Sequence, residues 1–161
     1  MLFRYNLSEM QIALLVSTLP HLARLLASPL WGRLFDRLNF FSLRIAINFC
    51  FLLSVLSFFS TNNIAMLCVA AVIFGLSNSG GDVAWNLWVT KFAPHGFVPD
   101  YMAVHTFFTG LRGLVAPMVA FTLLDSYPLT TLMWVSAGLM SLATVQLFFI
   151  RGTANRGIVQ Q

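Results

Sequence analysis

The sequence predicts an all-α membrane protein with five transmembrane helices, and its composition and charge pattern lead to this fold class. Hydrophobic residues make up 58% of the 161 residues and charged residues 9%, whereas soluble domains carry about 25% charged residues. Two long stretches, residues 45–81 and 126–150, contain no charged residue. A helix needs about 20 apolar residues to cross a bilayer, so these stretches are long enough to span a membrane.

Breaks in the hydrophobic pattern divide the chain into five predicted helices. The first ends where the charged residues of 33–37 begin, and the second ends at the polar run 60–63. The third ends before the next basic residue, and the turn Asp-Ser-Tyr-Pro at 125–128 separates the fourth from the fifth. The predicted bounds are residues 10–31, 41–59, 64–89, 101–124 and 129–150. Residues 1–150 therefore form a predicted transmembrane domain, and 151–161 a short polar cytoplasmic tail.

The basic residues predict how this domain is oriented. Five spans place the termini on opposite sides of the membrane, and Lys and Arg collect on the cytoplasmic side. One side carries only Arg4, and the other carries Arg33, Arg37, Arg44, Lys91, Arg151 and Arg156. The N-terminus is thus predicted outside and the C-terminus in the cytoplasm. Because these charges stand singly, without interleaved aromatic residues, the predicted partner is the lipid bilayer and no nucleic-acid partner is predicted.

Three of the predicted helices carry a stripe of small and polar residues on one face. At about 100° per residue, one face of the helix at 64–89 contains Ala71, Gly75, Asn78, Ser79, Asp82 and Asn86. The helix at 10–31 carries Ser17, His21, Arg24 and Ser28. The helix at 101–124 carries His105, Thr109, Arg112, Gly113 and Ala116. These three helices are predicted to face a polar pathway, and the other two, with scattered polar residues, to be peripheral.

Three charged residues on these stripes, Arg24, Asp82 and Arg112, are predicted to lie at one level, roughly 13–17 Å from the cytoplasmic helix ends. A charge at this depth is costly unless it is paired or hydrated. Asp82 is therefore either a structural counter-ion of one arginine or a group that contacts a substrate or coupling ion. His21 and His105 are either packing and hydrogen-bonding residues or proton carriers. The predicted substrate or coupling-ion pathway consists of Asn78, Asp82, Asn86, Arg24, Arg112, His21 and His105.

Two of the stripes share a short motif. Pro29 follows Arg24 with the same spacing as Pro117 follows Arg112, and the two copies lie 88 residues apart. The two predicted helices run in opposite directions, which is the arrangement of an inverted-topology repeat. Each proline removes one backbone hydrogen bond, so a kink is predicted in each helix.

The segment from Gly32 to Asn39, Gly-Arg-Leu-Phe-Asp-Arg-Leu-Asn, joins the first two predicted helices. It resembles the Gly-x-x-x-Asp-Arg/Lys-x-Gly loop of the major facilitator superfamily, with Asn39 in place of the second glycine. Gly32 is expected to permit close helix approach, and Arg37 to anchor the loop in the cytoplasm. Asp36 is expected to cap the helix that begins near Tyr101. These residues, Gly32, Asp36 and Arg37, form the predicted cytoplasmic gating loop.

The resemblance covers the whole chain as helices eight to twelve of that family, a partial C-terminal half. It implies a secondary active transporter that works by alternating access in a bacterial cytoplasmic (inner) membrane, with an unidentified small-molecule substrate. Transport by this chain alone is not expected. Its partners would be missing N-terminal helices or a separately encoded half.

The alternative function is a non-transporting membrane interaction or assembly protein derived from the same fold. An enzyme is not predicted, because the sequence contains no HExxH, no GxSxG and no glycine-rich phosphate loop. No cofactor and no metal site is predicted either. Cys50 and Cys68 lie in apolar stretches without metal-ligand spacing.

Overall fold

The structure, a computed structural model, describes residues 7–61, 63–94 and 96–158, with side chains as far as Arg151. Every regular element in these ranges is a helix: α1 (Glu9–Ala13), the π-helical turn η2 (Leu14–Thr18), α2 (Leu19–Arg37), α3 (Phe40–Ser60), α4 (Ile64–Phe92), α5 (Val98–Ser126) and α6 (Leu129–Ile158). The first three form one span, Glu9–Arg37. Five helices in the described part are long and apolar enough to cross a membrane, which confirms the predicted number.

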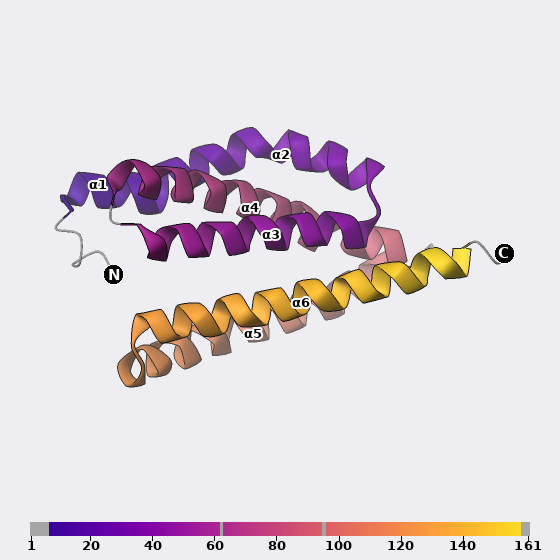
Figure 1. The fold of residues 1–161 in the computed structure, drawn as a ribbon. Helices are drawn as coiled ribbons and strands as arrows, with labels where there is room; N and C mark the ends of the chain where they lie inside the picture. The colour runs from indigo at the N-terminus through magenta and orange to yellow at the C-terminus, as the bar shows by residue number, and fades with distance from the viewer. Residues whose placement is uncertain (1–6, 62, 95, 159–161) are drawn as a thin grey trace.

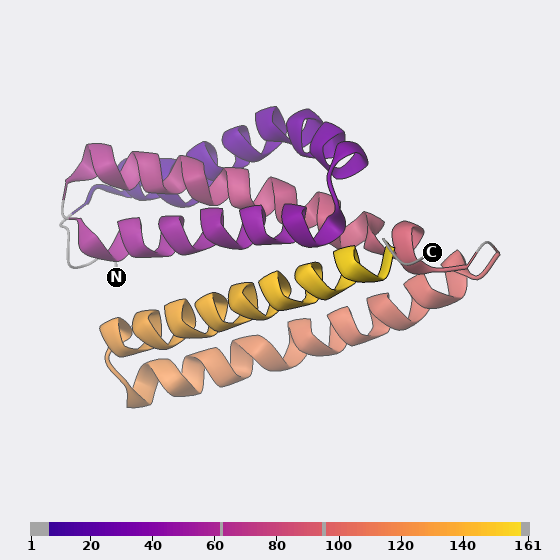
Figure 2. The same cartoon turned by 45° about the vertical axis from the view of Figure 1, so that its right-hand side comes forward.

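Helices α2, α3 and α4 pack together, and α5 and α6 lie along one side of this group (Figures 1 and 2). The most extensive contacts join α2 to α4 and α3 to α4, and α6 is held mainly by α3. By contrast, α5 touches α4 and α6 only over short stretches, and none of its residues is buried. The helix predicted at 41–59 as peripheral is therefore more enclosed, in the described structure, than the one predicted at 101–124 to line a pathway.

Polar side chains define where three of the helices begin. Ser8 and Gln11 form a reciprocal capping box at the start of α1, in which each side chain accepts a hydrogen bond from the other residue's backbone N–H. The Asn39 side chain accepts from the N–H of Phe41 at 2.9 Å and starts α3. In the same way, the side chain of Asn63 starts α4. Because these groups satisfy backbone donors that have no partner within the helix, the connections between spans can be short.

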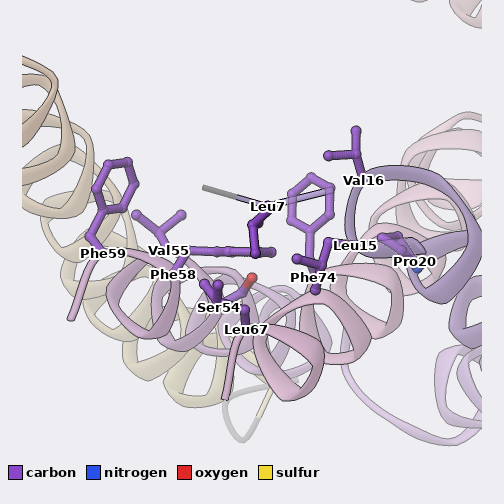
Figure 3. Close-up of a pocket in the computed structure, with 10 residues that line it drawn as sticks. All are labelled: Leu7, Leu15, Val16, Pro20, Ser54, Val55, Phe58, Phe59, Leu67 and Phe74. Atoms are coloured by element: carbon purple, nitrogen blue, oxygen red, sulfur yellow. The ribbon is translucent and has the colours of Figure 1, made fainter. Parts of the chain in front are cut away.

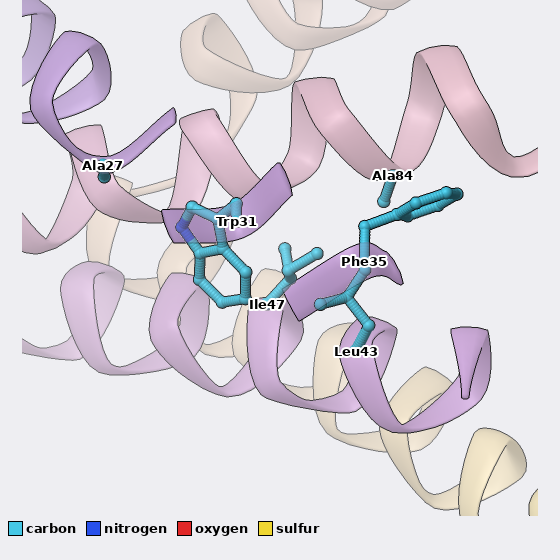
Figure 4. Packing of buried hydrophobic residues seen from close by; sticks show 6 residues of the cluster. All are labelled: Ala27, Trp31, Phe35, Leu43, Ile47 and Ala84. Atoms are coloured by element: carbon cyan, nitrogen blue, oxygen red, sulfur yellow. The ribbon is translucent and has the colours of Figure 1, made fainter. Parts of the chain in front are cut away.

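The core lies between α2, α3 and α4 (Figure 4). Trp31 of α2 is its largest side chain, and its indole Nε1–H donates to the carbonyl oxygen of Leu76 in α4 at 2.9 Å. A Cβ at Gly80 would lie 2.8 Å from the Trp31 ring and 2.9 Å from Ile47. The absence of a side chain at Gly80 therefore lets the indole of α2 reach the backbone of α4.

A second close contact joins α2 to α4 near the start of α2. A Cβ at Gly75 would lie only 2.2 Å from the carbonyl oxygen of Pro20. Pro20 is the second residue after the π-helical turn η2, which inserts one residue into the helical repeat. The two backbones are thus in contact where α2 begins, and this contact requires glycine at position 75.

The segment Gly32–Asn39 is not the loop that was predicted. Gly32, Asp36 and Arg37 belong to the last turns of α2, and only Leu38 and Asn39 connect α2 to α3. Charged side chains are compatible with a helix, and a basic residue in the last turn stabilises it through the helix dipole. The helix predicted to end at residue 31 therefore continues to 37.

The last predicted helix is also longer in the structure. It was expected to end at residue 150, before the polar tail, and α6 ends at Ile158. The first residues of the predicted tail are thus helical. Residues 159–161 lie outside the described part of the chain.

Candidate functional site

An ion pair between α2 and α4 lies at the centre of the predicted pathway. Nε of Arg24 lies 2.6 Å from Oδ2 of Asp82. The contact of Pro20 with Gly75 and that of Trp31 with Gly80 fix the two helices against each other, so that Arg24 faces Asp82. The two side chains are 50% and 44% exposed, respectively. The pair is therefore formed but open on one side.

A cavity of about 220 Å³ lies next to this pair. Its polar walls are Arg24, His21 and Asn78, and its apolar walls include Val16 and Phe74. The ring Nδ1 of His21 donates to the carbonyl of Ser17 at 2.8 Å, and the Asn78 amide donates to the carbonyl of Phe74 at 2.9 Å. Each of these side chains thus uses one polar atom within its own helix. The second imidazole nitrogen and the amide oxygen remain to interact with a polar solute.

Arg112 does not join the ion pair. Its guanidinium lies over the ring of Trp85, 4.6 Å from the ring centroid. Trp85 follows Asp82 by three residues on α4, so both predicted arginines contact neighbouring positions of the same helix, one from α2 and one from α5. Of the three charges predicted to lie at one level, Arg24 and Asp82 are thus paired, and Arg112 forms a cation–π contact instead.

His105 belongs to this second group of side chains. The indole Nε1–H of Trp88 donates to its Nδ1 at 3.3 Å, and the ring of Trp85 lies 4.6 Å from the imidazole centroid. A cavity of about 420 Å³, lined by Trp88, His105 and Tyr101 among others, opens beside it. The predicted pathway residues therefore fall into two groups, one between α2 and α4 and one between α4 and α5. Asn86 lies exposed on α4 and forms no hydrogen bond with any described residue.

The residues of the predicted gating loop do not make the contacts that were expected. A Cβ at Gly32 would meet no atom within 4 Å among the described residues, so no helix approaches closely there. Asp36 forms no hydrogen bond or ion pair with any part of the chain that the structure describes, and the predicted cap on α5 near Tyr101 is absent. Asp36 and Arg37 lie exposed on the last turn of α2.

Lys91 makes the contact at this end that the sequence reasoning missed. Its ammonium donates to the carbonyl oxygens of Phe35 and, at 3.1 Å, of Leu38, and it lies 4.2 Å from the centroid of the Phe35 ring. Phe35 lies in the last turn of α2 and Leu38 directly follows the helix, so neither carbonyl has a partner within the helix. Lys91 therefore joins the ends of α4 and α2. The sequence showed Lys91 near the end of the third predicted helix, but it did not indicate that the carbonyl oxygens of Phe35 and Leu38 are its partners.

A third cavity, apolar and of about 360 Å³, lies between the start of the first span, α3 and α4 (Figure 3). Leu15, Phe58 and Leu67 are among its walls, and Ser54 is its only polar side chain among the residues that line it. The Ser54 hydroxyl donates to the carbonyl of Ala70 at 3.1 Å. This cavity therefore presents no free polar side-chain group that could recognise a polar substrate.

Comparison with known proteins identifies the family. The family model described as Major Facilitator Superfamily matches residues 1–159. No curated protein and no solved structure gave a match. The family match, together with five apolar helices and no strand in the described residues, shows an integral membrane protein. The chain belongs to the Major Facilitator Superfamily, a family of transporters.

Proposed function

We propose that this chain is part of a secondary active transporter that works by alternating access, with Asp82 as its coupling-ion site and Arg24 as the counter-ion. The supporting observation is the 2.6 Å ion pair and its open cavity. Asp82 lies ten residues before the end of α4, or about 15 Å along the helix. Ionisable residues at such depth usually face a bundle interior or an aqueous cavity. A proton, a cation or a polar solute could thus reach the carboxylate from the side of His21 and Asn78.

We also propose that the five spans correspond to helices eight to twelve of the family and that further helices cover α5. Arg112 is exposed and lies midway along α5, 14 residues from each end. An arginine at the centre of a helix that faced only lipid would cost several kcal/mol. Additional N-terminal helices, or a separately encoded half, would enclose Arg112 and complete a pathway between repeats.

We further propose that the chain lies in the cytoplasmic membrane of a bacterium, with its N-terminus outside. Five described basic residues gather at one end of the bundle: Arg33, Arg37, Arg44, Lys91 and Arg151. We call this end of the bundle the positive end. The positive-inside rule assigns that end to the cytoplasm.

Transport into membrane vesicles tests this proposal. Vesicles from cells that produce the chain together with the helices that complete the transporter are offered labelled sugars, amino acids, nucleosides and organic ions under an imposed proton or sodium gradient. One class of compound should accumulate against its gradient. Asp82→Asn should abolish this accumulation and spare downhill exchange, because the carboxylate that carries the coupling ion is lost. The matched change Asp125→Asn, at an exposed position near the end of α5, should leave both unchanged.

Two results would contradict the proposal. If Asp82→Asn only lowers the amount of folded protein, Asp82 is a structural counter-ion of Arg24. If the vesicles accumulate no compound and the chain co-purifies with one membrane protein, the alternative function of an interaction or assembly protein is favoured. The exposed length of α5, with no buried residue over Val98–Ser126, is the surface that such a function would use.

A further inference from the structure

A crevice between α3 and α6, away from the Arg24–Asp82 pair, contains a charged side chain without a partner. Its volume is about 700 Å³, and its polar walls are Arg44, Asn48 and Gln146. The Asn48 amide donates to the Thr144 hydroxyl at 3.3 Å and joins the two helices. The guanidinium of Arg44 forms no hydrogen bond or ion pair with any described residue. No acidic side chain is among the described residues that line the crevice, so these residues carry a net positive charge.

The depth of these residues indicates which kind of anion the crevice suits. Arg44 lies four residues after Phe40, the first residue of α3, or about 6 Å along the helix. Phe51 lies eleven residues after Phe40, about 16 Å along, which is close to half of a 30 Å hydrocarbon core. The polar group thus lies near the membrane interface at the positive end, and the wall continues inward with Phe51, Leu139 and Met140. Arginine reaches phosphate oxygens from such a position, because its aliphatic stem lies along apolar surface.

We propose that this crevice binds one anionic phospholipid from the leaflet at the positive end. The phosphate accepts hydrogen bonds from Arg44 and Gln146, and one acyl chain lies against Phe51 and Leu139. A soluble phosphate ester would share the head-group contacts, but it would leave the apolar lower half of the crevice unfilled. Charge complementarity and the apolar wall below the guanidinium therefore favour a lipid. Phe40 and Phe51, which line this site, also pack against the core cluster, but neither Arg24 nor Asp82 lines it.

Native mass spectrometry of the purified chain in dodecyl maltoside tests the lipid site. Dioleoyl phosphatidylglycerol and dioleoyl phosphatidylcholine are titrated separately, because they share acyl chains and differ in charge. We expect one phosphatidylglycerol to be retained with a preference of about tenfold over phosphatidylcholine, because the quaternary ammonium of phosphatidylcholine would add a second positive charge beside the guanidinium. Arg44→Gln should abolish this preference and Arg44→Lys should keep most of it. The control Arg33→Gln, at an exposed position on α2 at the same end, should retain it in full.

Each other outcome overturns the assignment. Equal lipid preference in Arg44→Gln and in the unchanged chain would show that Arg44 is not the site, and an equal loss in Arg33→Gln would show a general charge effect. Displacement of the lipid by glycerol 3-phosphate would assign the crevice to a soluble phosphate ester instead. Where Arg44→Gln fails to give folded protein by circular dichroism, Ala143→Trp serves as the second variant. It fills the crevice with the charge intact, so it should exclude the lipid, and retained binding would contradict the site.

Discussion

Arg24 and Asp82 depend on each other because neither has another charged partner among the described residues. Removing one side chain leaves the other charge unpaired inside a membrane span, whereas removing both leaves none. Arg24→Leu and Asp82→Leu should therefore each lower the free energy of unfolding. The double variant should lose less stability than the sum of the two single losses. The expected coupling energy is about 0.5 to 3 kcal/mol, toward the lower end because both groups are half exposed. Loss of helicity on titration with sodium dodecyl sulfate measures it.

Arg33→Leu is the control for this cycle. Arg33 is exposed and unpaired in the part of the chain that the structure describes, so its replacement should change stability by no more than about 0.5 kcal/mol. When Arg33→Leu is combined with Asp82→Leu, the two losses of stability should add. Additivity of Arg24→Leu and Asp82→Leu as well would show that the ion pair contributes nothing to the fold.

For single side chains, the sequence predicted the interaction partner best where few candidate partners existed. Asp82 was the only acidic residue deep in a predicted span, so only Arg24 and Arg112 were candidates if it was a structural counter-ion, and Arg24 forms the pair. The rotation of α5 about its axis decided that Arg112 meets Trp85 instead. Helical periodicity gives the face of a residue on its own helix, but it does not give the orientation of the neighbouring helix. Trp85 and Asp82, three residues apart, were a visible signal that was not used.

At the scale of helices, the contact between α2 and α4 depends on two glycines. A methyl group at position 75 would meet backbone atoms of Pro20, at 2.2 Å from the oxygen and 2.8 Å from the carbon. Backbone atoms cannot rotate away as a side chain can, so the helices must separate. Gly75→Ala should therefore destabilise the chain by about 1 to 3 kcal/mol. A lower thermal unfolding midpoint in detergent is the expected measurement.

Gly110→Ala gives the opposite expectation and serves as the control. A Cβ at Gly110, in the interior of α5, would meet no described atom within 4 Å. Alanine favours a helix over glycine by up to about 1 kcal/mol, so the midpoint should stay the same or rise. If Gly75→Ala is tolerated equally well, the close approach of α4 to Pro20 is not required for the fold.

The positions of the helices could be predicted from hydrophobicity, but their ends and internal irregularities could not. The polar breaks before Ile64 and Leu129 placed the starts of α4 and α6 correctly. The end of α2 was missed because Lys91, distant in sequence, supplies donors to its last carbonyls. The π-helical turn at Leu14–Thr18 was missed as well. Its residues are ordinary helix formers, and only the contact of Pro20 with Gly75 in the folded chain indicates the position where the extra residue is accommodated.

For the whole molecule, the distribution of charge over the bundle sets its orientation. Five basic residues lie at the positive end, whereas the opposite end carries none among the described residues and has the acidic Glu9 and Asp125. Lys and Arg near the ends of spans are retained on the cytoplasmic side during insertion, and acidic residues contribute little. The ends of α3 and α5, at Ser60 and Ser126, are therefore expected outside, and the end of α4 inside.

Two introduced cysteines test this orientation in intact cells. Ser60→Cys, at the exposed end of α3, should react with a membrane-impermeant maleimide added from outside. Thr90→Cys, at the exposed end of α4, should react only after the cells are opened. The unchanged chain is the control, because Cys50 and Cys68 lie half-buried within spans and should react little in either case. Labelling of Thr90→Cys in intact cells, with protection of Ser60→Cys, would reverse the orientation. It would then place the Arg44 crevice in the outer leaflet, where the lipid supply must be sought.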